Sequence, residues 1–138
     1  MEVHRLGYLY LNCKPDSIKY EDSQAKLSSF YNLLKASKAA KLREGLKDHL
    51  HQRFVPPEDF IGQPLTIKTD FWMLGVTYYF MLNGEYPFPA ESTFEAIKSK
   101  CEKGFDYKES IENGKSHNLS SATPENCEFF RKVFVIDA

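Results

Sequence analysis

The chain has 138 residues, of which 42% are hydrophobic, enough for one domain with a single core and too few residues for two. Its 18 basic and 19 acidic residues leave a formal net charge of −1, so the composition gives no reason to expect nucleic acid or an anionic membrane as a partner. The longest apolar run, FWMLGVTYYFML, is shorter than the roughly 20 residues that a membrane-spanning helix needs. Cys13, Cys101 and Cys127 form no C-x-x-C pair and predict reduced thiols instead of a disulfide or a zinc site.

The first half of the chain predicts a hairpin and then a helix. Short alternating runs at 17–20 and 25–28 flank the polar turn EDSQ, which is typical of a small β-hairpin. We expect little other strand in the chain. From Asn32 to Arg53, alanines and leucines recur at helical spacing, interrupted only by Gly45. This pattern predicts one helix or two short ones.

A very apolar helix is predicted in the middle of the chain. Pro56 and Pro57 should end the preceding helix, because proline lacks the N–H donor, and a loop should then run to Thr69. The segment 70–82 is apolar on all sides, which indicates a helix buried at the centre of a domain. Gly84 follows it as the expected left-handed cap.

Two amphipathic helices are predicted in the last third. Ser92 and Glu95 have capping-box spacing, and Phe94, Ile97 and Cys101 form an apolar stripe behind them. The polar segment 105–122 predicts a surface loop. Thr123 followed by Pro124 is a typical helix start, and the last helix should turn inward a face made of Cys127, Phe130, Val133 and Phe134.

These elements and their motifs together resemble the carboxy-terminal, helical lobe of eukaryotic protein kinases. GYLYLNCKPDSI is similar to the family's G-x-x-H-R-D-L-K-P-x-N-I catalytic loop, and AKLSSFY falls where the family has D-F-G. FVPPEDF resembles the A-P-E segment, and KTDFWMLGVTYYFMLNGEYPF resembles the signature of the family's central buried helix. FFRKVFVIDA is similar to a later helix. The calcium/calmodulin-dependent serine/threonine branch is the nearest in pattern.

The resemblance places neutral side chains at the family's chemical positions. Asn12 stands where the family has its catalytic aspartate, and Ser17 and Ser29 stand where it has metal ligands. An amide is no base at neutral pH, and neutral hydroxyls are poor ligands for Mg²⁺. Of the loop's chemical groups, only Lys14 is kept. The resemblance therefore implies a chain without catalysis, metal or cofactor.

Other residues that match the family have structural roles there. The resemblance implies that Asp70 holds the backbone of the catalytic loop, with Trp72 and Gly75 keeping the architecture around it. It makes Tyr10 and Phe30 core aromatics. Glu58 matches a glutamate that the family pairs with an arginine absent from this chain, so we expect it to be exposed, bound to another cation or covered by a partner.

A basic segment replaces the family's activation segment. Residues 35–53 carry more basic than acidic side chains, with leucines at helical spacing. Such a helix either binds partners or presents a solvated face over a core stripe, and both readings stay open. His49 and His51 are two positions apart and should not share a metal. The candidate partner-binding residues are Lys35, Lys38, Lys41, Arg43 and Lys47.

We therefore expect a mainly α fold: a kinase-like C-terminal lobe, with a small β-hairpin and a central buried helix. The gly-rich loop and strand lysine of the amino-terminal lobe are absent, so protein partners are expected to cover the face that this lobe would occupy. The predicted function is an inactive, pseudokinase-like scaffold or structural subunit, cytoplasmic or in a cytoskeletal or other large assembly, with no nucleic acid and no membrane span. The alternatives are the helical half of a split or wrongly bounded serine/threonine kinase and a regulator that mimics a kinase lobe. We expect one domain, 1–138. Its expected parts are a degenerate catalytic loop at 8–20, a degenerate D-F-G region at 25–31, a replaced activation segment at 32–58, the buried helix at 70–83 and later helices at 92–103 and 123–136.

Overall fold

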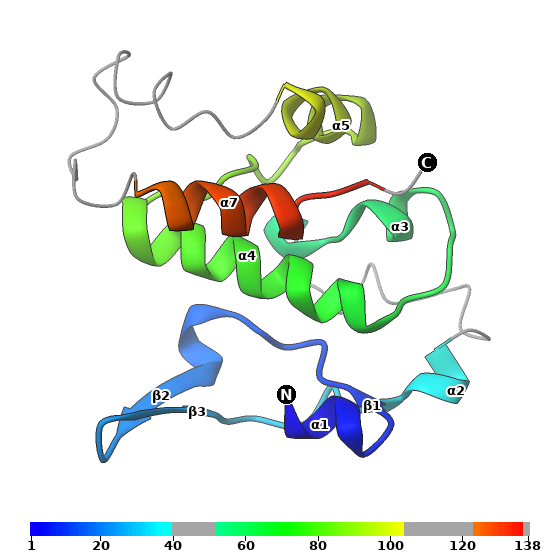
Figure 1. Cartoon of the computed structure of the whole chain (residues 1–138). Helices are drawn as coiled ribbons and strands as arrows, with labels where there is room; N and C mark the ends of the chain where they lie inside the picture. The colour runs from blue at the N-terminus through cyan, green and yellow to red at the C-terminus, as the bar shows by residue number, and fades with distance from the viewer. Residues whose placement is uncertain (40–51, 104–122, 137–138) are drawn as a thin grey trace.

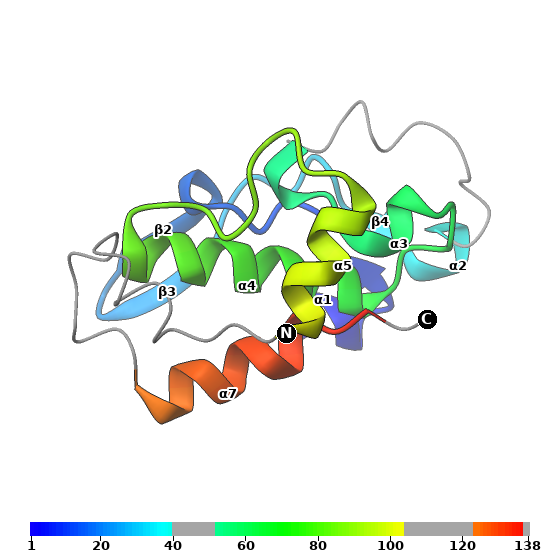
Figure 2. The same cartoon turned by 90° about the horizontal axis from the view of Figure 1, so that it is seen from above.

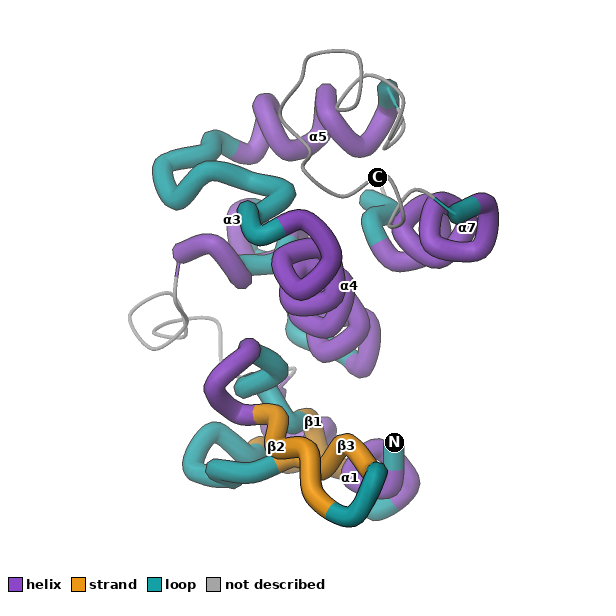
Figure 3. Tube along the Cα trace, turned by 90° about the vertical axis from the view of Figure 1, so that its left-hand side faces the viewer, coloured by secondary structure: helices purple, strands orange, loops and turns teal. Residues whose placement is uncertain are grey.

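The fold is organised around one long helix, α4 (Ile67–Asn83). The computed structural model describes residues 1–39, 52–103 and 123–136. On one side of α4 lie α1 (Glu2–Arg5), β1 (Tyr8–Leu9) and a hairpin, and on the other lie α3 (Pro57–Phe60), α5 (Phe94–Glu102) and α7 (Pro124–Val133) (Figures 1 and 3). Helix α4 is therefore the layer on which both sides pack.

Helix α4 is buried around most of its circumference, as its all-round apolar sequence predicts. It begins at Ile67 instead of Asp70, because the Thr66 side chain accepts the backbone N–H of Lys68 at 3.2 Å and caps the first turn. At its other end Gly84 has a φ of 72° and donates its N–H to Phe80, the predicted left-handed cap.

The prediction of a loop from Pro57 to Thr69 is partly wrong. Pro57 begins a short helix, α3, since proline is well tolerated in a first turn, where no intrahelical partner exists for its missing N–H. The loop therefore lies only between the end of α3 and Thr66.

The β-hairpin is present, with strands β2 (Ile18–Glu21) and β3 (Gln24–Leu27). The two strands pair antiparallel, with Lys19 opposite Lys26. Asp22 and Ser23 form the turn, and both have positive φ, 51° and 60°, as a two-residue turn that follows the twist of the strands requires.

The prediction of a helix from Asn32 is wrong at its start, where the structure has a second pair of short strands. Strand β4 (Leu34–Lys35) pairs with β1, and only four helical residues follow it, α2 (Ala36–Ala39). The end of the predicted helix is also different, because Gln52–Phe54 is a 3-10 turn, η2. Two-residue strands are too short to show an alternating pattern, so pairing with β1 decides their conformation. The rest of that predicted helix lies outside the described residues.

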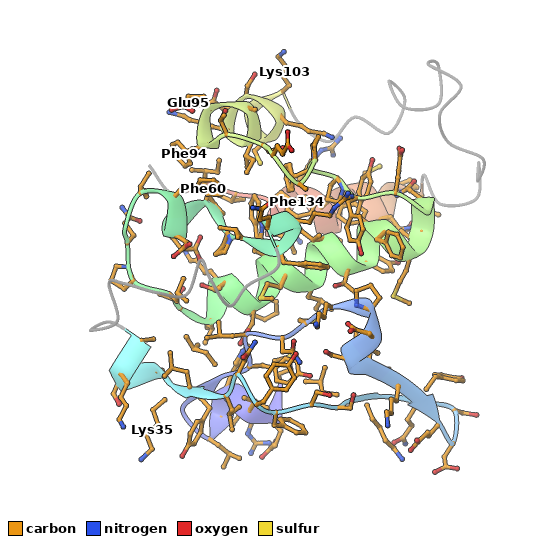
Figure 4. The ribbon with its side chains drawn as sticks, turned by 180° about the vertical axis from the view of Figure 1, so that it is seen from behind. Lys35, Phe60, Phe94, Glu95, Lys103 and Phe134 are labelled. Atoms are coloured by element: carbon orange, nitrogen blue, oxygen red, sulfur yellow. The ribbon has the colours of Figure 1, made fainter. Side chains whose placement is uncertain are left out.

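The two amphipathic helices are shorter than predicted. Thr93, and not Ser92, caps α5 by accepting the backbone N–H of Ala96 at 3.2 Å. Thr123 caps α7 as expected, by accepting from Asn126. Figure 1 shows α5 and α7 on the same side of α4, and Figure 2 shows α7 lying beside α4. Figure 4 shows Phe60 and Phe94 near each other, with ring centroids 6.3 Å apart. The predicted loop 105–122 lies outside the described residues.

Aromatic rings fill the space between α4 and α7. The Trp72 ring stacks on Phe88 with centroids 5.2 Å apart and meets the edge of Phe134 at 5.0 Å. Gly75 brings the helices close, because a Cβ there would lie 2.5 Å from Cγ1 of Val133. In the part of the chain that the structure describes, no helix is both long and apolar enough to cross a membrane.

Candidate functional site

The candidate site is the loop after β1, which a buried carboxylate on α4 holds in place. Asp70 accepts the backbone N–H of Tyr10 at 2.8 Å and of Leu11 at 2.7 Å, and its Oδ2 lies 2.7 Å from Nε2 of His4. Asp70 is only 2% exposed. Three donors around one carboxylate offset the unfavourable burial of its charge, so the anchor fixes both α1 and the loop against α4.

The backbone of this loop has an uncommon conformation at Leu11. Its φ is 53°, which a bulky side chain rarely adopts. The amide of Asn32 donates to the Leu11 carbonyl at 3.1 Å, and the Thr77 hydroxyl donates to the Cys13 carbonyl at 2.7 Å. These bonds, with those to Asp70, stabilise the strained backbone.

The structure brings Asn12 and Ser29 together. The Asn12 amide donates from Nδ2 to the Ser29 carbonyl at 2.9 Å, and its Oδ1 accepts from the Tyr31 hydroxyl at 3.2 Å. Asn12 is therefore engaged at both ends of its amide. A side chain used in this way orients two neighbouring segments, and it neither takes up nor releases a proton near neutral pH.

Ser17 and Lys14 lie at the same loop but are engaged differently. Ser17 is buried at the end of η1 (Pro15–Ser17), and its carbonyl accepts the N–H of Ser28 at 2.8 Å. The Lys14 ammonium lies 3.5 Å from Asp16. Burial alone would lower the pKa of Lys14, but Asp16 and Tyr31 outweigh it and hold this pKa above its usual range.

Tyr10 and Phe30, the two aromatics expected in the core, differ in burial. Tyr10 is fully buried and donates its hydroxyl to the Ser28 carbonyl, and burial raises its pKa. Phe30 is 51% exposed, although its ring edge touches Tyr10 at 5.5 Å between centroids, so the prediction of a core position is wrong for Phe30. Nothing in the described part of the chain packs over its outer face.

Glu58 is half-buried and has no cationic partner among the described residues. Its Oε1 accepts a hydrogen bond from the Thr69 hydroxyl at 2.6 Å. Thr69 belongs to the first turn of α4, so Glu58 links α3 to α4. We expected Glu58 to be exposed, bound to another cation or covered by a partner, and the structure shows it partly buried with a hydroxyl as its donor.

The basic segment is described only at its start. Lys35 and Lys38 are exposed on β4 and α2, and Figure 4 shows Lys35 at the edge of the molecule. Lys41, Arg43 and Lys47 lie outside the described residues, as do His49 and His51. Among the described residues, the structure therefore shows no cluster of the candidate basic side chains.

Two residues of the site were not singled out from the sequence. Tyr31 ends the AKLSSFY segment, and its contact with Asn12 depends on the turn at Ser29, where φ is 62°. His4 lies in a short polar stretch, and its approach to Asp70 spans 66 positions. No local pattern signals either contact.

The sequence resembles kinases and kinase-domain proteins. No family model matches it. It is 31% identical over 107 residues, 75% of this chain, to the muscle M-line assembly protein unc-89 of Caenorhabditis elegans, and 34% identical over 102 residues, 67% of this chain, to the human myotonin-protein kinase. It is 33% identical over 100 residues, 69% of this chain, to the mouse sperm motility kinase 3A. The chain spans only 1%, 16% and 19% of these relatives.

A solved structure shows the same arrangement of elements. The granulovirus kinase PK-1 of Cydia pomonella superposes on 99% of this chain with a TM-score of 0.67, at 14% sequence identity. This chain covers 46% of the viral one. At that identity the likeness concerns the fold alone.

Proposed function

We propose that this chain, which has a kinase-like fold, is a catalytically inactive carboxy-terminal lobe that serves as a protein-interaction or scaffold module. One observation carries the proposal: the Asn12 amide, at the position of the family's base, is hydrogen-bonded at both ends to the segment that follows β3. It has no useful basicity, and a positioned base typically contributes about 10²–10⁴-fold in rate. The hydroxyls of Ser17 and Ser29 offer no negative charge to balance Mg²⁺ and phosphate.

A scaffold role is supported by the surface beside this loop. Leu6, Phe30 and Tyr31 are more than half exposed, at 68%, 51% and 69%, and Leu33 is 39% exposed. These side chains belong to the segments around β1 and β4, which pair with each other. Exposed apolar groups on one part of a fold commonly mark a contact with another protein.

One relative favours a large assembly as the setting. Unc-89 is named as a muscle M-line assembly protein. We propose by analogy that this chain is a cytoplasmic component of a cytoskeletal or other large assembly, with a protein partner on the face around residues 1–11. Lysine-directed cross-linking of the native assembly should join Lys35 or Lys38 to a second chain.

The test of inactivity is the response to Mg-ATP. We expect no thermal shift and no transfer of the γ-phosphate to a generic peptide substrate. A saturable, Mg²⁺-dependent shift of several degrees would overturn the proposal. The variant Asn12→Ala is the matched control, since any shift that reflects chemistry at this loop should disappear in it.

The alternative is the helical half of a split serine/threonine kinase. It is favoured by the names of relatives such as the myotonin-protein kinase. Under this alternative the Mg²⁺-dependent shift appears once a chain supplying the amino-terminal lobe is added. The neutral groups at Asn12, Ser17 and Ser29 argue against that outcome.

A further inference from the structure

Tyr31 combines an accessible side chain with a hydroxyl inside the candidate site. It is 69% exposed and lies in the segment 28–33, which joins β3 to β4 and belongs to no helix or strand. In Figure 1 this segment runs on the side of α4 opposite α5 and α7. The Tyr31 hydroxyl donates to Oδ1 of Asn12 at 3.2 Å. Another enzyme can therefore reach this phenol without unfolding the domain.

A cation already lies beside this hydroxyl. Burial alone would lower the pKa of Lys14, and its contacts with Asp16 and with the Tyr31 hydroxyl outweigh that effect. The ammonium lies 3.5 Å from Asp16, whose side chain is 74% exposed. Such an exposed ion pair contributes little, so Asp16 can turn toward water and leave Lys14 to a stronger anion. An anion attached to Oη of Tyr31 would lie within reach of this ammonium.

Tyr20 is the other exposed tyrosine among the described residues, and its surroundings differ. It is 76% exposed and lies in β2, where it pairs with Ala25 of β3. Its backbone is fixed in the ladder of the hairpin, whereas the segment 28–33 lies outside any ladder. Segments outside a ladder open at a lower free energy than paired strands do. Of the two tyrosines, Tyr31 is therefore the one that can enter the active site of another enzyme.

We propose that Tyr31 is a phosphorylation site, modified by a tyrosine kinase that uses ATP, and that Lys14 binds the phosphate. In this step Oη of Tyr31 forms a bond to the γ-phosphorus of ATP, the bond from this phosphorus to the oxygen of the β-phosphate breaks, and ADP leaves. The proton of the hydroxyl passes to the base of that kinase. The inference goes beyond the proposed function, because this chain is here the substrate and not the catalyst.

The phosphate exchanges one contact of the loop for another. It carries a charge of about −1.5 to −2 at pH 7 and offers three acceptor oxygens, but it has no donor for Oδ1 of Asn12. The hydrogen bond from Tyr31 to Asn12 is therefore lost, and a charge-assisted pair with Lys14 replaces it. The bond from Asn12 to the Ser29 carbonyl does not involve Tyr31 and persists. The loop thus has two arrangements, and the modification selects between them.

The first test measures where phosphate is accepted. The full chain is incubated with Mg-ATP and the catalytic domain of a tyrosine kinase of broad specificity, with a sample lacking that kinase as the control. Trypsin separates the acceptors, since Tyr31 lies in LSSFYNLLK and Tyr20 in YEDSQAK, and mass spectrometry of these peptides gives the rates. The two free peptides, phosphorylated under the same conditions, correct for the sequence preference of the kinase. After this correction, Tyr31 of the folded chain should be modified several-fold faster than Tyr20.

The second test measures the contact with Lys14. Phosphorus NMR of the modified chain follows the second pKa of the phosphate, which is about 6 without a neighbouring charge. One positive charge at about 4 Å should lower this pKa by roughly 0.7. Lys14→Gln should restore it, whereas Lys98→Gln, which removes an exposed lysine on α5, should leave it low. Circular dichroism melts check that each variant folds.

Two outcomes would overturn the inference. One is that Tyr31 stays unmodified, or is modified no faster than Tyr20 after the correction by the free peptides. The other is a phosphate whose pKa is the same in the wild type and in Lys14→Gln, which would show that Lys14 does not bind it.

Discussion

The imidazole of His4 lies 2.7 Å from the carboxylate of Asp70, although 66 positions separate them in the chain. The same carboxylate accepts the backbone N–H groups of Tyr10 and Leu11. Asp70 therefore connects α1, the loop after β1 and α4 at one buried point. This connection preserves the form of the loop and needs none of the side chains that phosphoryl transfer would use.

Replacing Asp70 by alanine should strongly destabilise the fold. It leaves the N–H groups of Tyr10 and Leu11 and the His4 ring without their acceptor in the interior, and losses of this type are about 3–5 kcal/mol. Urea unfolding followed by Trp72 fluorescence measures the change. Asp16→Asn removes a carboxylate on the surface and should be nearly neutral. A similar loss in both variants would contradict the assigned role of Asp70.

Substituting Gly75 by alanine should destabilise the packing of α4 on α7. The new Cβ would lie 2.5 Å from Cγ1 of Val133, so a side chain or helix must shift, at about 1–3 kcal/mol. This exceeds the roughly 1 kcal/mol by which alanine favours a helix over glycine. The double variant Gly75→Ala with Val133→Ala should be less destabilised than the sum of the single variants. Additive effects would show that the clash is relieved elsewhere.

Stability should fall in alkaline solution because of Cys13. Burial raises the pKa of this thiol from 9.0 to about 12, with the charge of Asp70 adding to the effect. Between these values the unfolded chain has released the proton and the folded chain has kept it, so the free energy of unfolding decreases as the pH rises. The decrease reaches about 1.4 kcal/mol per pH unit for one proton.

The variant Cys13→Ala isolates this effect from other groups that titrate at high pH. Urea unfolding of both proteins from about pH 8 to pH 11 should give curves that converge as the pH rises, because only the wild type loses the contribution of the thiol. Parallel curves would contradict a buried, protonated Cys13.

The start of α5 gives a direct test of a corrected assignment. Thr93→Ala should cost about 0.5–2 kcal/mol, because the side chain of Thr93 accepts from Ala96 in the first turn. Ser92→Ala, one position earlier, should be close to neutral. Thermal melts of the two variants decide between the two caps, and a larger effect at Ser92 would restore the prediction from the sequence.

Many elements of the fold could be predicted from local sequence patterns. The all-round apolar segment, the Gly84 cap and the Thr123-Pro124 start each depend on neighbours within a few residues, so the sequence shows them. The hairpin depends on a turn of two residues and was found for the same reason. Strands β1 and β4 were missed because each has two residues and is held only by the other. The exposure of Phe30 was missed because it depends on what packs above it.

The sequence by itself determined the helical elements around α4 and the neutral side chains at Asn12, Ser17 and Ser29, because periodicity and residue chemistry are local properties. Only the tertiary structure decided what these groups contact. Three contacts join segments that are separated in the sequence. These are the hydrogen bonds of the Asn12 amide with Ser29 and Tyr31, the hydrogen bond from Thr69 to Glu58, and the walls of the pocket beside Trp72, which come from α3, α4 and α7. Such contacts arise from the packing of α3 and α7 on α4 and from backbone turns, which no spacing of residues encodes.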